Sequence, residues 1–384
     1  MRILNICAYT WEIGGPAKII YDHTTEVLKQ GHQVDILSPT TPGDEMYPAP
    51  EGARLFPVAR TTPVSNFYRE FSIGMYRFLK RHIHDYDVIH MHGIWHFGSL
   101  LPFLIPNNAI KVITIHGLLD KWAVAHHKWK KDIVTLLYQK RILGKADLIQ
   151  INNTDEEADV IRYLGYRPKN MVIIPNGMKL AEYSDLPARG SFRAKHQVAE
   201  HEQVVLFMGR LNIKKGLDLL LPAFKKVEKQ LSNATLFLAG GDDGYQQETE
   251  DFIRKNNLQK RIKLVGLLTD SAKKEALADA DVFVLPSYSE GFSIAVLEAM
   301  NFRVPAIVSD RVGFGDYIKR YDAAVLTPLT SEGVAKGLLK ILQDKPYAQE
   351  LVNHAYNMVT ENFDIRKQAN QLLEEYKQVR KSNE

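Results

Sequence analysis

The sequence predicts an α/β protein made of two doubly wound parallel-sheet domains, and three observations support this. Short apolar runs alternate with segments of helical periodicity from one end of the chain to the other, as in successive βαβ units. A stretch rich in Gly, Pro, Ser and charged residues over 176–202 separates two such series. The length of 384 residues exceeds one ordinary core and suits two domains.

The first predicted domain, residues 1–185, contains the first series. Its short apolar runs predict strands over 3–6, 33–37, 88–92, 111–115, 148–151 and 171–174. Between them lie helical stretches. Thr154 and Glu157 have the spacing of a capping box, and the apolar stripe that follows stops at Gly165. The alternation predicts one parallel sheet that is covered by helices.

The second predicted domain, residues 186–363, repeats this organisation. Its strands are expected over 204–208, 235–238, 262–265, 282–285, 306–308 and 323–326. Apolar residues over 217–227 predict a helix, in which Pro222 predicts a kink or a later start. The closing segment, 364–384, carries a single apolar stripe. It predicts a helix that packs back towards the first domain.

Composition and charge exclude several classes of protein. With 49 basic and 45 acidic residues, the formal net charge of +4 is too small for nucleic-acid binding driven by counterion release. Cys7 is the only cysteine, so neither a disulfide framework nor a thiolate metal cluster is expected. The chain begins with a strand-like run, without a signal-peptide pattern, and contains no apolar run of membrane-spanning length. We therefore expect a cytoplasmic protein.

Two glutamates, Glu290 and Glu298, form the most informative motif. They have seven residues between them and follow the apolar run 282–286. Ligands of open parallel sheets bind beyond the carboxyl ends of the strands, where Glu290 is expected. Glu298 falls at helical spacing in the next segment and can face the same ligand. The pair predicts a polyol site, and the alternative is a helix-start carboxylate followed by a solvated helix position.

Cations follow another strand of the second domain. Arg210 is expected at the end of the strand over 204–208, and Lys215 at the entrance to the next helix. Guanidinium binds phosphate in a bidentate manner and ammonium adds a mobile point charge. The pair therefore predicts a clamp for a leaving diphosphate. The alternative is a solvated basic turn.

Two strand ends of the first domain add further candidates. Gly14, Gly15 and Pro16 follow the first strand, where glycines allow close backbone approach and proline suits the first helical position. His116 ends the strand over 111–115 and can donate to a sugar hydroxyl or a phosphate. A tight turn and a structural histidine are the alternatives.

Two other patterns in the first domain involve histidines and a basic, partly apolar stretch. His90 and His92 share a strand face, but no carboxylate or cysteine lies at ligand spacing, so no metal site is predicted. The stretch 126–141 mixes cations with the apolar residues Trp129, Ile133, Leu136 and Leu137. A solvated face over a core stripe is the favoured interpretation, and contact with an anionic bilayer is the alternative.

With these residues in view, the whole chain resembles the retaining glycosyltransferases of the GT-B fold, specifically glycosyltransferase family 4. The run from Glu290 to Glu298, followed by Ala299 and Met300, is the most specific element. The pattern also includes Gly209 with Arg210, Lys215 with Gly216, His116 with Gly117, Gly14 with Gly15, and residues 175–177. The resemblance implies two Rossmann-like domains that face each other across a cleft, with the donor mainly in the second domain and no bound metal or cofactor.

The resemblance also implies a role for each matching residue. Glu298 would bind the ribose hydroxyls, Glu290 the hydroxyls of the donor sugar, and Arg210 and Lys215 the diphosphate. His116 would approach the donor sugar and completes the catalytic set. The leucines Leu267 and Leu268 would cup the base. The backbone amides of Phe292, Ser293 and Ile294 would lie near the sugar and the distal phosphate. The other donor contacts implied are Gly14, Gly15 and Gly291.

Two departures from the family pattern concern the surroundings of this site. Asn301, Phe302 and Arg303 stand where small residues are usual, and Asp316 stands where glutamate is usual. The residues implied to contact the donor are unaffected. The packing beneath the donor site and the role of the turn before Asp316 are therefore open.

The resemblance predicts a metal-independent, retaining hexosyltransferase that acts in polysaccharide biosynthesis. The expected donor is a UDP-sugar, with UDP-glucose favoured and a GDP-sugar as the alternative, and the acceptor is a hydroxyl of a glycan or a lipid-linked glycan. A sugar-nucleotide epimerase, a phosphorylase or a catalytically silent partner subunit that binds nucleotide-sugar are the other functions considered. Peripheral contact with the inner face of the membrane and the oligomeric state are left open.

Overall fold

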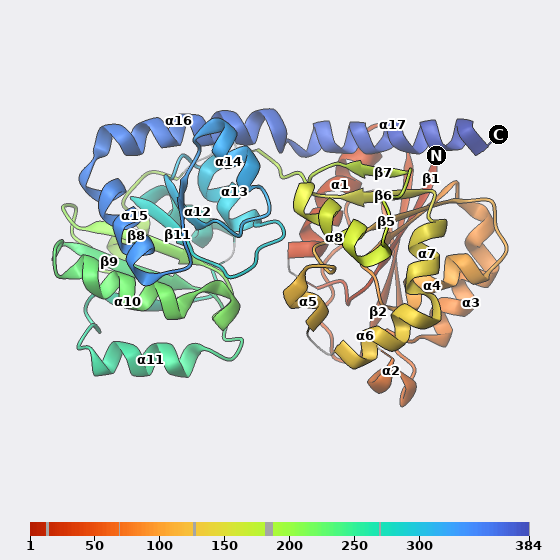
Figure 1. Cartoon of the computed structure of the whole chain (residues 1–384), viewed down its shortest axis with the longest axis horizontal. Helices are drawn as coiled ribbons and strands as arrows, with labels where there is room; N and C mark the ends of the chain where they lie inside the picture. The colour runs from red at the N-terminus through yellow and green to blue at the C-terminus, as the bar shows by residue number, and fades with distance from the viewer. Residues whose placement is uncertain (13–14, 69, 126–127, 181–186, 269, 384) are drawn as a thin grey trace. The chain divides into compact units, whose positions relative to one another are not determined.

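A computed structural model describes residues 1–12, 15–68, 70–125, 128–180, 187–268 and 270–383. The chain divides into two compact units (Figure 1). Unit 1 comprises Met1–Lys179 and Phe363–Glu384, and unit 2 comprises Leu180–Asn362. The expected division between residues 185 and 186 falls within 181–186, which lie outside the described residues.

Unit 1 contains a seven-stranded parallel sheet in the order β3-β2-β1-β4-β5-β6-β7. An edge strand, β3, was missed by the sequence prediction. It contains Pro57, and none of its six residues is buried, which an edge strand tolerates because one side of it has no partner strand. The strands are β1 (Arg2–Cys7), β2 (Gln33–Thr40), β3 (Arg54–Ala59), β4 (Val88–His92), β5 (Ile110–Thr114), β6 (Leu148–Ile151) and β7 (Met171–Ile173).

Helices cover both faces of this sheet. On one face, α1 and α17 pack beside each other over Val34, Val88 and Val112, and Leu372 and Tyr376 of α17 are buried there (Figure 1). The helices of unit 1 are α1 (Gly15–Lys29), α2 (Val64–Phe67), α3 (Ile73–His82), α4 (Phe97–Leu104), α5 (Lys121–Ala125), α6 (Lys128–Val134), α7 (Lys140–Lys145), α8 (Thr154–Leu164) and α17 (Ile365–Asn383), with a 3-10 turn η1 (Ile83–Asp85) and a π-helical turn η2 (Thr135–Gln139).

The start of α8 differs by one residue from the expected capping box. Asn153, not Thr154, is the N-cap, and its side chain accepts a hydrogen bond from the Glu156 amide at 2.8 Å. The Glu156 carboxylate in turn accepts from the Asn152 amide at 2.7 Å. Asparagine is an equally good cap, so the local pattern alone allowed both starts.

Unit 2 contains a six-stranded parallel sheet in the order β10-β9-β8-β11-β12-β13. Its central strands are continuous apolar runs because helices cover both faces. The strands are β8 (Gln203–Met208), β9 (Ala234–Ala239), β10 (Ile262–Gly266), β11 (Val282–Leu285), β12 (Ala306–Ser309) and β13 (Val325–Thr327).

The helix that contains Pro222 begins at Leu217, so the expected later start is wrong. Six buried apolar side chains anchor this helix, and their burial outweighs the one backbone hydrogen bond that the proline cannot donate. The helices of unit 2 are α9 (Ser191–Lys195), α10 (Leu217–Glu228), α11 (Gln246–Lys255), α12 (Asp270–Asp279), α13 (Ile294–Asn301), α14 (Gly315–Tyr321), α15 (Ser331–Gln343) and α16 (Lys345–Asn362), with a 3-10 turn η4 (Ile213–Lys215). Over the described ranges, no helix of either unit has the length and apolarity to cross a bilayer.

Candidate active site

The loops that follow β8, β9 and β11 pack backbone against backbone at the carboxyl end of the unit 2 sheet. A Cβ atom on Gly216, which has a φ of 73°, would lie 2.0 Å from the carbonyl oxygen of Pro286. One on Gly240, with a φ of 158°, would lie 1.8 Å from the carbonyl oxygen of Gly209. Only glycine fits at these two positions. The loops that carry the predicted cations and glutamates are thereby held together.

Lys215 and Glu290 meet directly in this region. The Lys215 Nζ lies 2.6 Å from the Glu290 Oε2, and the two side chains are 18% and 12% exposed. Both were predicted from their places after β8 and β11, which are neighbouring strands although the residues are 75 positions apart. An ammonium and a carboxylate in mutual contact can bind a phosphate oxygen and a sugar hydroxyl side by side.

The glycine-rich turn before Asp316 supports the backbone of Glu290. Glu290 forms an isolated parallel bridge with Val312, and the Gly313 amide donates to the Glu290 carbonyl at 2.6 Å. The rings of Phe292 and Phe314 pack edge to face, with centroids 5.8 Å apart. This turn therefore positions the first glutamate of the motif.

The second glutamate has a partner that the sequence prediction missed. Glu298 lies on α13, and its Oε1 is 2.5 Å from the Nζ of Lys273 on α12. Their side chains are 16% and 30% exposed. Nothing in the sequence distinguishes Lys273 from Lys274 beside it. Only the packing of α12 near α13 selects Lys273.

Arg210 has surroundings that differ from those of Lys215. Its Nη1 lies 2.6 Å from the Asp243 Oδ2, and its side chain is 72% exposed. Asp243 also accepts from the Asn212 side chain, so this second ion pair is attached to the same loop. The structure thus brings Lys215 to Glu290 and pairs Arg210 with another carboxylate.

The other predicted donor contacts of unit 2 frame these ion pairs. Ser293 is a buried N-cap of α13, and Gly291, Phe292 and Ile294 flank it at the helix start. Leu267 is 70% exposed directly after β10, with the half-exposed Leu268 next to it. An exposed leucine at a strand end has no role in the core, which is compatible with contact to a ligand.

In unit 1, His116 follows β5 in the left-handed region, with a φ of 54°. Its ring stacks on that of His92, at the end of β4, with centroids 5.4 Å apart and an angle of 25° between the planes. The His116 Nε2 lies 3.1 Å from the His92 Nδ1. A histidine rarely adopts this backbone conformation, so the stacking and the hydrogen bond hold it in place.

A chain of hydrogen bonds fixes which nitrogen of His116 carries the proton. Asn5 donates through its Nδ2 to Thr24, so its Oδ1 accepts from the His92 Nε2 at 3.2 Å. The His92 Nδ1 is then an acceptor, and the His116 Nε2 donates to it. The Nε2 proton of His116 is therefore used within the protein. The nitrogen that His116 offers to a ligand is Nδ1, which accepts a hydrogen bond where donation was expected. Sequence reasoning missed Asn5, whose only signal is a polar residue within an apolar strand.

Burial keeps these histidines neutral. Desolvation lowers the pKa of His116 to about 4, and it lowers the pKa values of His90 and His92 well below the usual value, with nearby histidines adding to the effect. His90 is bonded on both ring nitrogens, to Thr114 at 2.6 Å and to the Tyr376 hydroxyl at 2.8 Å. Among the described residues, no group of three or more potential ligands is arranged to hold a metal ion.

Of the predicted glycines of unit 1, Gly14 lies outside the described residues and Gly15 is the first residue of α1.

Asn301, which stands where the family pattern has a small residue, gives a stability prediction. It is 2% exposed on α13, and within the described structure neither its Oδ1 nor its Nδ2 has a hydrogen-bonding partner. Such an amide costs about 1–3 kcal/mol. We expect Asn301→Ala to raise the free energy of unfolding by about 1 kcal/mol, after the loss from a small cavity. Urea unfolding followed by circular dichroism measures it.

Asn152→Ala is the matched control for this prediction. Asn152 is also 2% exposed, but its side chain bonds Glu156 and the Asn176 amide. Its replacement should destabilise the protein by about 2 kcal/mol because these partners lose their bonds. Equal losses of stability in the two variants would contradict the prediction.

Two family models match the chain, one in each half. The model described as Glycosyltransferase Family 4 matches residues 13–182, and the model described as Glycosyl transferases group 1 matches residues 188–358. The chain belongs to glycosyltransferase family 4. Its two sheets have the arrangement of the GT-B fold, and the protein is a glycosyltransferase that uses a nucleotide-sugar.

Individual proteins that resemble this family 4 glycosyltransferase include one curated relative and two solved structures. The relative is the UDP-Gal:alpha-D-GlcNAc-diphosphoundecaprenol alpha-1,3-galactosyltransferase of Escherichia coli, 27% identical over 79% of this chain and 78% of that protein. Sucrose-phosphate synthase from Thermosynechococcus elongatus superimposes over all of both chains with a TM-score of 0.82 and 20% identity. HepE from Anabaena, in complex with UDP-glucose, superimposes over 97% of this chain and 98% of that chain with a TM-score of 0.74 and 18% identity.

Proposed function

We propose that this family 4 glycosyltransferase transfers a hexose from a UDP-sugar, UDP-glucose in the first instance, to a hydroxyl of a glycan or lipid-linked acceptor, with retention of anomeric configuration and without a metal. The observation that carries the proposal is the contact between Lys215 and Glu290. A cation beside a hydroxyl acceptor is the combination that the breaking of a sugar–phosphate bond would need, and this supports the proposal.

Each charged side chain of the proposed site has an internal partner of opposite charge. Lys215 would turn from Glu290 towards the donor diphosphate, and Glu290 would accept from the sugar hydroxyls. Glu298, paired with Lys273, would accept from the ribose hydroxyls. In the free protein each of these charges is therefore satisfied by its partner. Arg210, which is 72% exposed and paired with Asp243, would add a further positive charge.

The proposed chemistry is a substitution on one face of the sugar. The bond between the anomeric carbon and the phosphate oxygen breaks, and the diphosphate leaves with the electron pair. Lys215, Arg210 and the amides at the start of α13 would stabilise that charge. The acceptor oxygen forms the new bond on the same face, and its proton passes to the leaving phosphate. His116 would contribute through its Nδ1, as an acceptor for a sugar hydroxyl.

The names of similar proteins support the choice of donor and acceptor. The Escherichia coli relative is named for UDP-galactose and for an acceptor on diphosphoundecaprenol, and the Anabaena structure holds UDP-glucose. Both support a uridine donor, and the first supports a lipid-linked acceptor.

A panel of UDP- and GDP-sugars tests the proposal. The purified protein should bind UDP-glucose and release UDP from it slowly in water, and the released sugar should keep the α configuration. Binding without release of UDP from any donor would identify a silent binding subunit. Conversion of the sugar without release of UDP would identify an epimerase. A β product would contradict retention.

A further inference from the structure

The helical run that begins with α6 has an apolar side that the core of unit 1 does not use. Ile142 and Leu143 of α7 are buried in the core, as folding of the unit requires. Trp129, Ile133, Leu136 and Leu137 are exposed instead, by 54%, 49%, 87% and 68%. The expected core stripe over these four residues is therefore wrong. Their spacing of four, three and one residues places them on one outward side of the helix.

Phe67 of α2 extends this outward side. It is 69% exposed, and its ring meets that of Trp129 edge to face, with centroids 5.9 Å apart. We call Phe67, Trp129, Ile133, Leu136 and Leu137 the apolar patch. The Nζ of Lys130 lies 5.3 Å and 5.5 Å from the two ring centroids, so a cation sits within the patch. Contiguous exposed apolar side chains of this kind mark an interaction surface.

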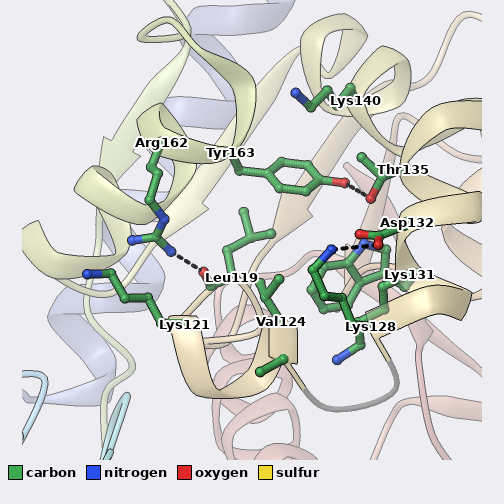
Figure 2. A pocket seen from close by; sticks show the side chains of 12 residues that line it. Leu119, Lys121, Val124, Lys128, Lys131, Asp132, Thr135, Lys140, Arg162 and Tyr163 are labelled. Atoms are coloured by element: carbon green, nitrogen blue, oxygen red, sulfur yellow. Dashed lines mark hydrogen bonds and ion pairs between the residues drawn. The ribbon is translucent and has the colours of Figure 1, made fainter.

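A basic hollow lies along the same helical run, and Figure 2 shows its lining. Its volume is about 430 Å³, and its base includes Leu119 and Tyr163. The charged side chains that line it are Lys121, Lys128, Lys131, Lys140, Arg162 and Asp132. Four lysines from α5, α6 and α7 thus line the hollow, and the lining contains one carboxylate, that of Asp132 (Figure 2).

Three of the five lining cations, Lys121, Lys131 and Lys140, make no ion pair among the described residues, and Lys131 donates to the Ala123 carbonyl instead. Lys128 is paired with Asp132 at 2.6 Å, and Arg162 is paired with an aspartate outside the lining. A second hollow, of about 390 Å³, is lined by both patch leucines together with Lys140 and Arg141. Unpaired cations therefore border the hydrocarbon surface of the patch.

This combination of groups fits an anionic lipid surface. Aromatic and aliphatic side chains favour the boundary between headgroups and acyl chains, and lysines beside them attract lipid phosphates. A helix that lies in the plane of the membrane surface does not need to be long enough to cross the bilayer. Self-association through the patch would bring the same cations of two copies against one another, which the shared charge opposes.

We propose that the apolar patch and its cations dock unit 1 on an anionic phospholipid bilayer, with Leu136 and Leu137 entering the acyl boundary and Lys121 and Lys140 binding lipid phosphates. The docking is independent of the proposed transfer reaction, because it requires neither donor nor acceptor. It would bring the enzyme to the surface on which a lipid-linked acceptor is displayed.

Sedimentation of the full chain with vesicles tests the docking, without any nucleotide-sugar present. We expect binding to vesicles of phosphatidylcholine and phosphatidylglycerol, weaker binding to phosphatidylcholine alone, and a loss of binding as salt is raised. The double variant Leu136→Ser/Leu137→Ser should lower the partition coefficient at least about tenfold. The double variant Lys121→Glu/Lys140→Glu should remove the preference for anionic vesicles.

Leu104→Ser is the matched control, because Leu104 is 62% exposed on unit 1 and lies outside the patch. It should bind vesicles as the parent protein does. The patch side chains are exposed, so unchanged circular dichroism is expected for every variant. Vesicle binding that is equal in the parent and the Leu136→Ser/Leu137→Ser variant would overturn the proposal. So would a parent dimer that this variant turns into a monomer while neither binds vesicles.

Discussion

Replacing Lys215 with alanine should lower turnover about 10²- to 10³-fold, because the leaving diphosphate loses the cation closest to Glu290. The charge develops as the bond breaks, so the loss should fall mainly on kcat rather than on KM. The free energy of unfolding should fall by at most about 3 kcal/mol, since both partners of the ion pair keep some contact with water. Release of UDP in steady state and urea unfolding measure the two effects separately.

Lys226→Ala provides the control for the Lys215 variant. Lys226 forms a similar ion pair with Glu332 at 2.5 Å, but the two side chains are 46% and 59% exposed, and neither residue belongs to the predicted donor set. Its removal deletes the same charge and should leave turnover unchanged. Near-normal turnover in Lys215→Ala, with stability intact, would remove the proposed charge stabilisation.

Acid should destabilise unit 1 because several of its histidines stay neutral in the folded state. Burial lowers the pKa of His23 and of His116 to about 4, and those of His90 and His92 also fall far below their usual value. In the unfolded chain these groups take up protons near pH 6.5. Stability is therefore fully present above about pH 6.5 and is lost as the pH falls towards 4.

The expected loss is large, since each such histidine contributes up to about 1.4 kcal/mol per pH unit. Between about pH 7.5 and about pH 5, we expect a loss of several kcal/mol in the free energy of unfolding. Burial raises the pKa of Glu156 to about 6, so protonation of this carboxyl adds stability as the pH falls. This single group opposes the loss from four histidines. All four tryptophans belong to the range of unit 1, so their fluorescence during urea unfolding reports on this unit.

A pair of histidine variants separates this effect from general acid sensitivity. His23→Gln removes one enclosed ring and should reduce the loss by about a quarter, if the four groups contribute equally. His82→Gln changes a histidine whose side chain is 49% exposed and should leave the loss unchanged. Equal stability at the two pH values in the parent protein would show that these rings are accessible to protons.

The fold class could be predicted because its signals are local. Apolar runs too short for helices and helical stripes between them identify parallel sheets wherever both faces are covered. The edge strand β3 was missed because its two faces are not both covered by helices. Its side chains are half-exposed or exposed and include Pro57, so no continuous apolar run marks the strand.

The charged residues of the candidate site were predicted one by one, but their partners were not. Lys215 and Glu290 follow strands that neighbour each other in the sheet, and this order is decided by the crossover connections rather than by residues near either position. Lys273 and Asn5 have no distinguishing local pattern. They acquire their roles from a helix contact and from the register of β1 beside β4.

The sequence by itself determined which elements form and which side chains follow the ends of the strands, because strand period, glycine positions and strand-end residues are properties of short segments. Tertiary structure alone decided which charges meet, which nitrogen of His116 is protonated, and which side of the run from Lys128 faces outward. A helical stripe is equally apolar whether it meets a core or a solvent-exposed surface. Only the packing of the rest of the unit distinguishes the two.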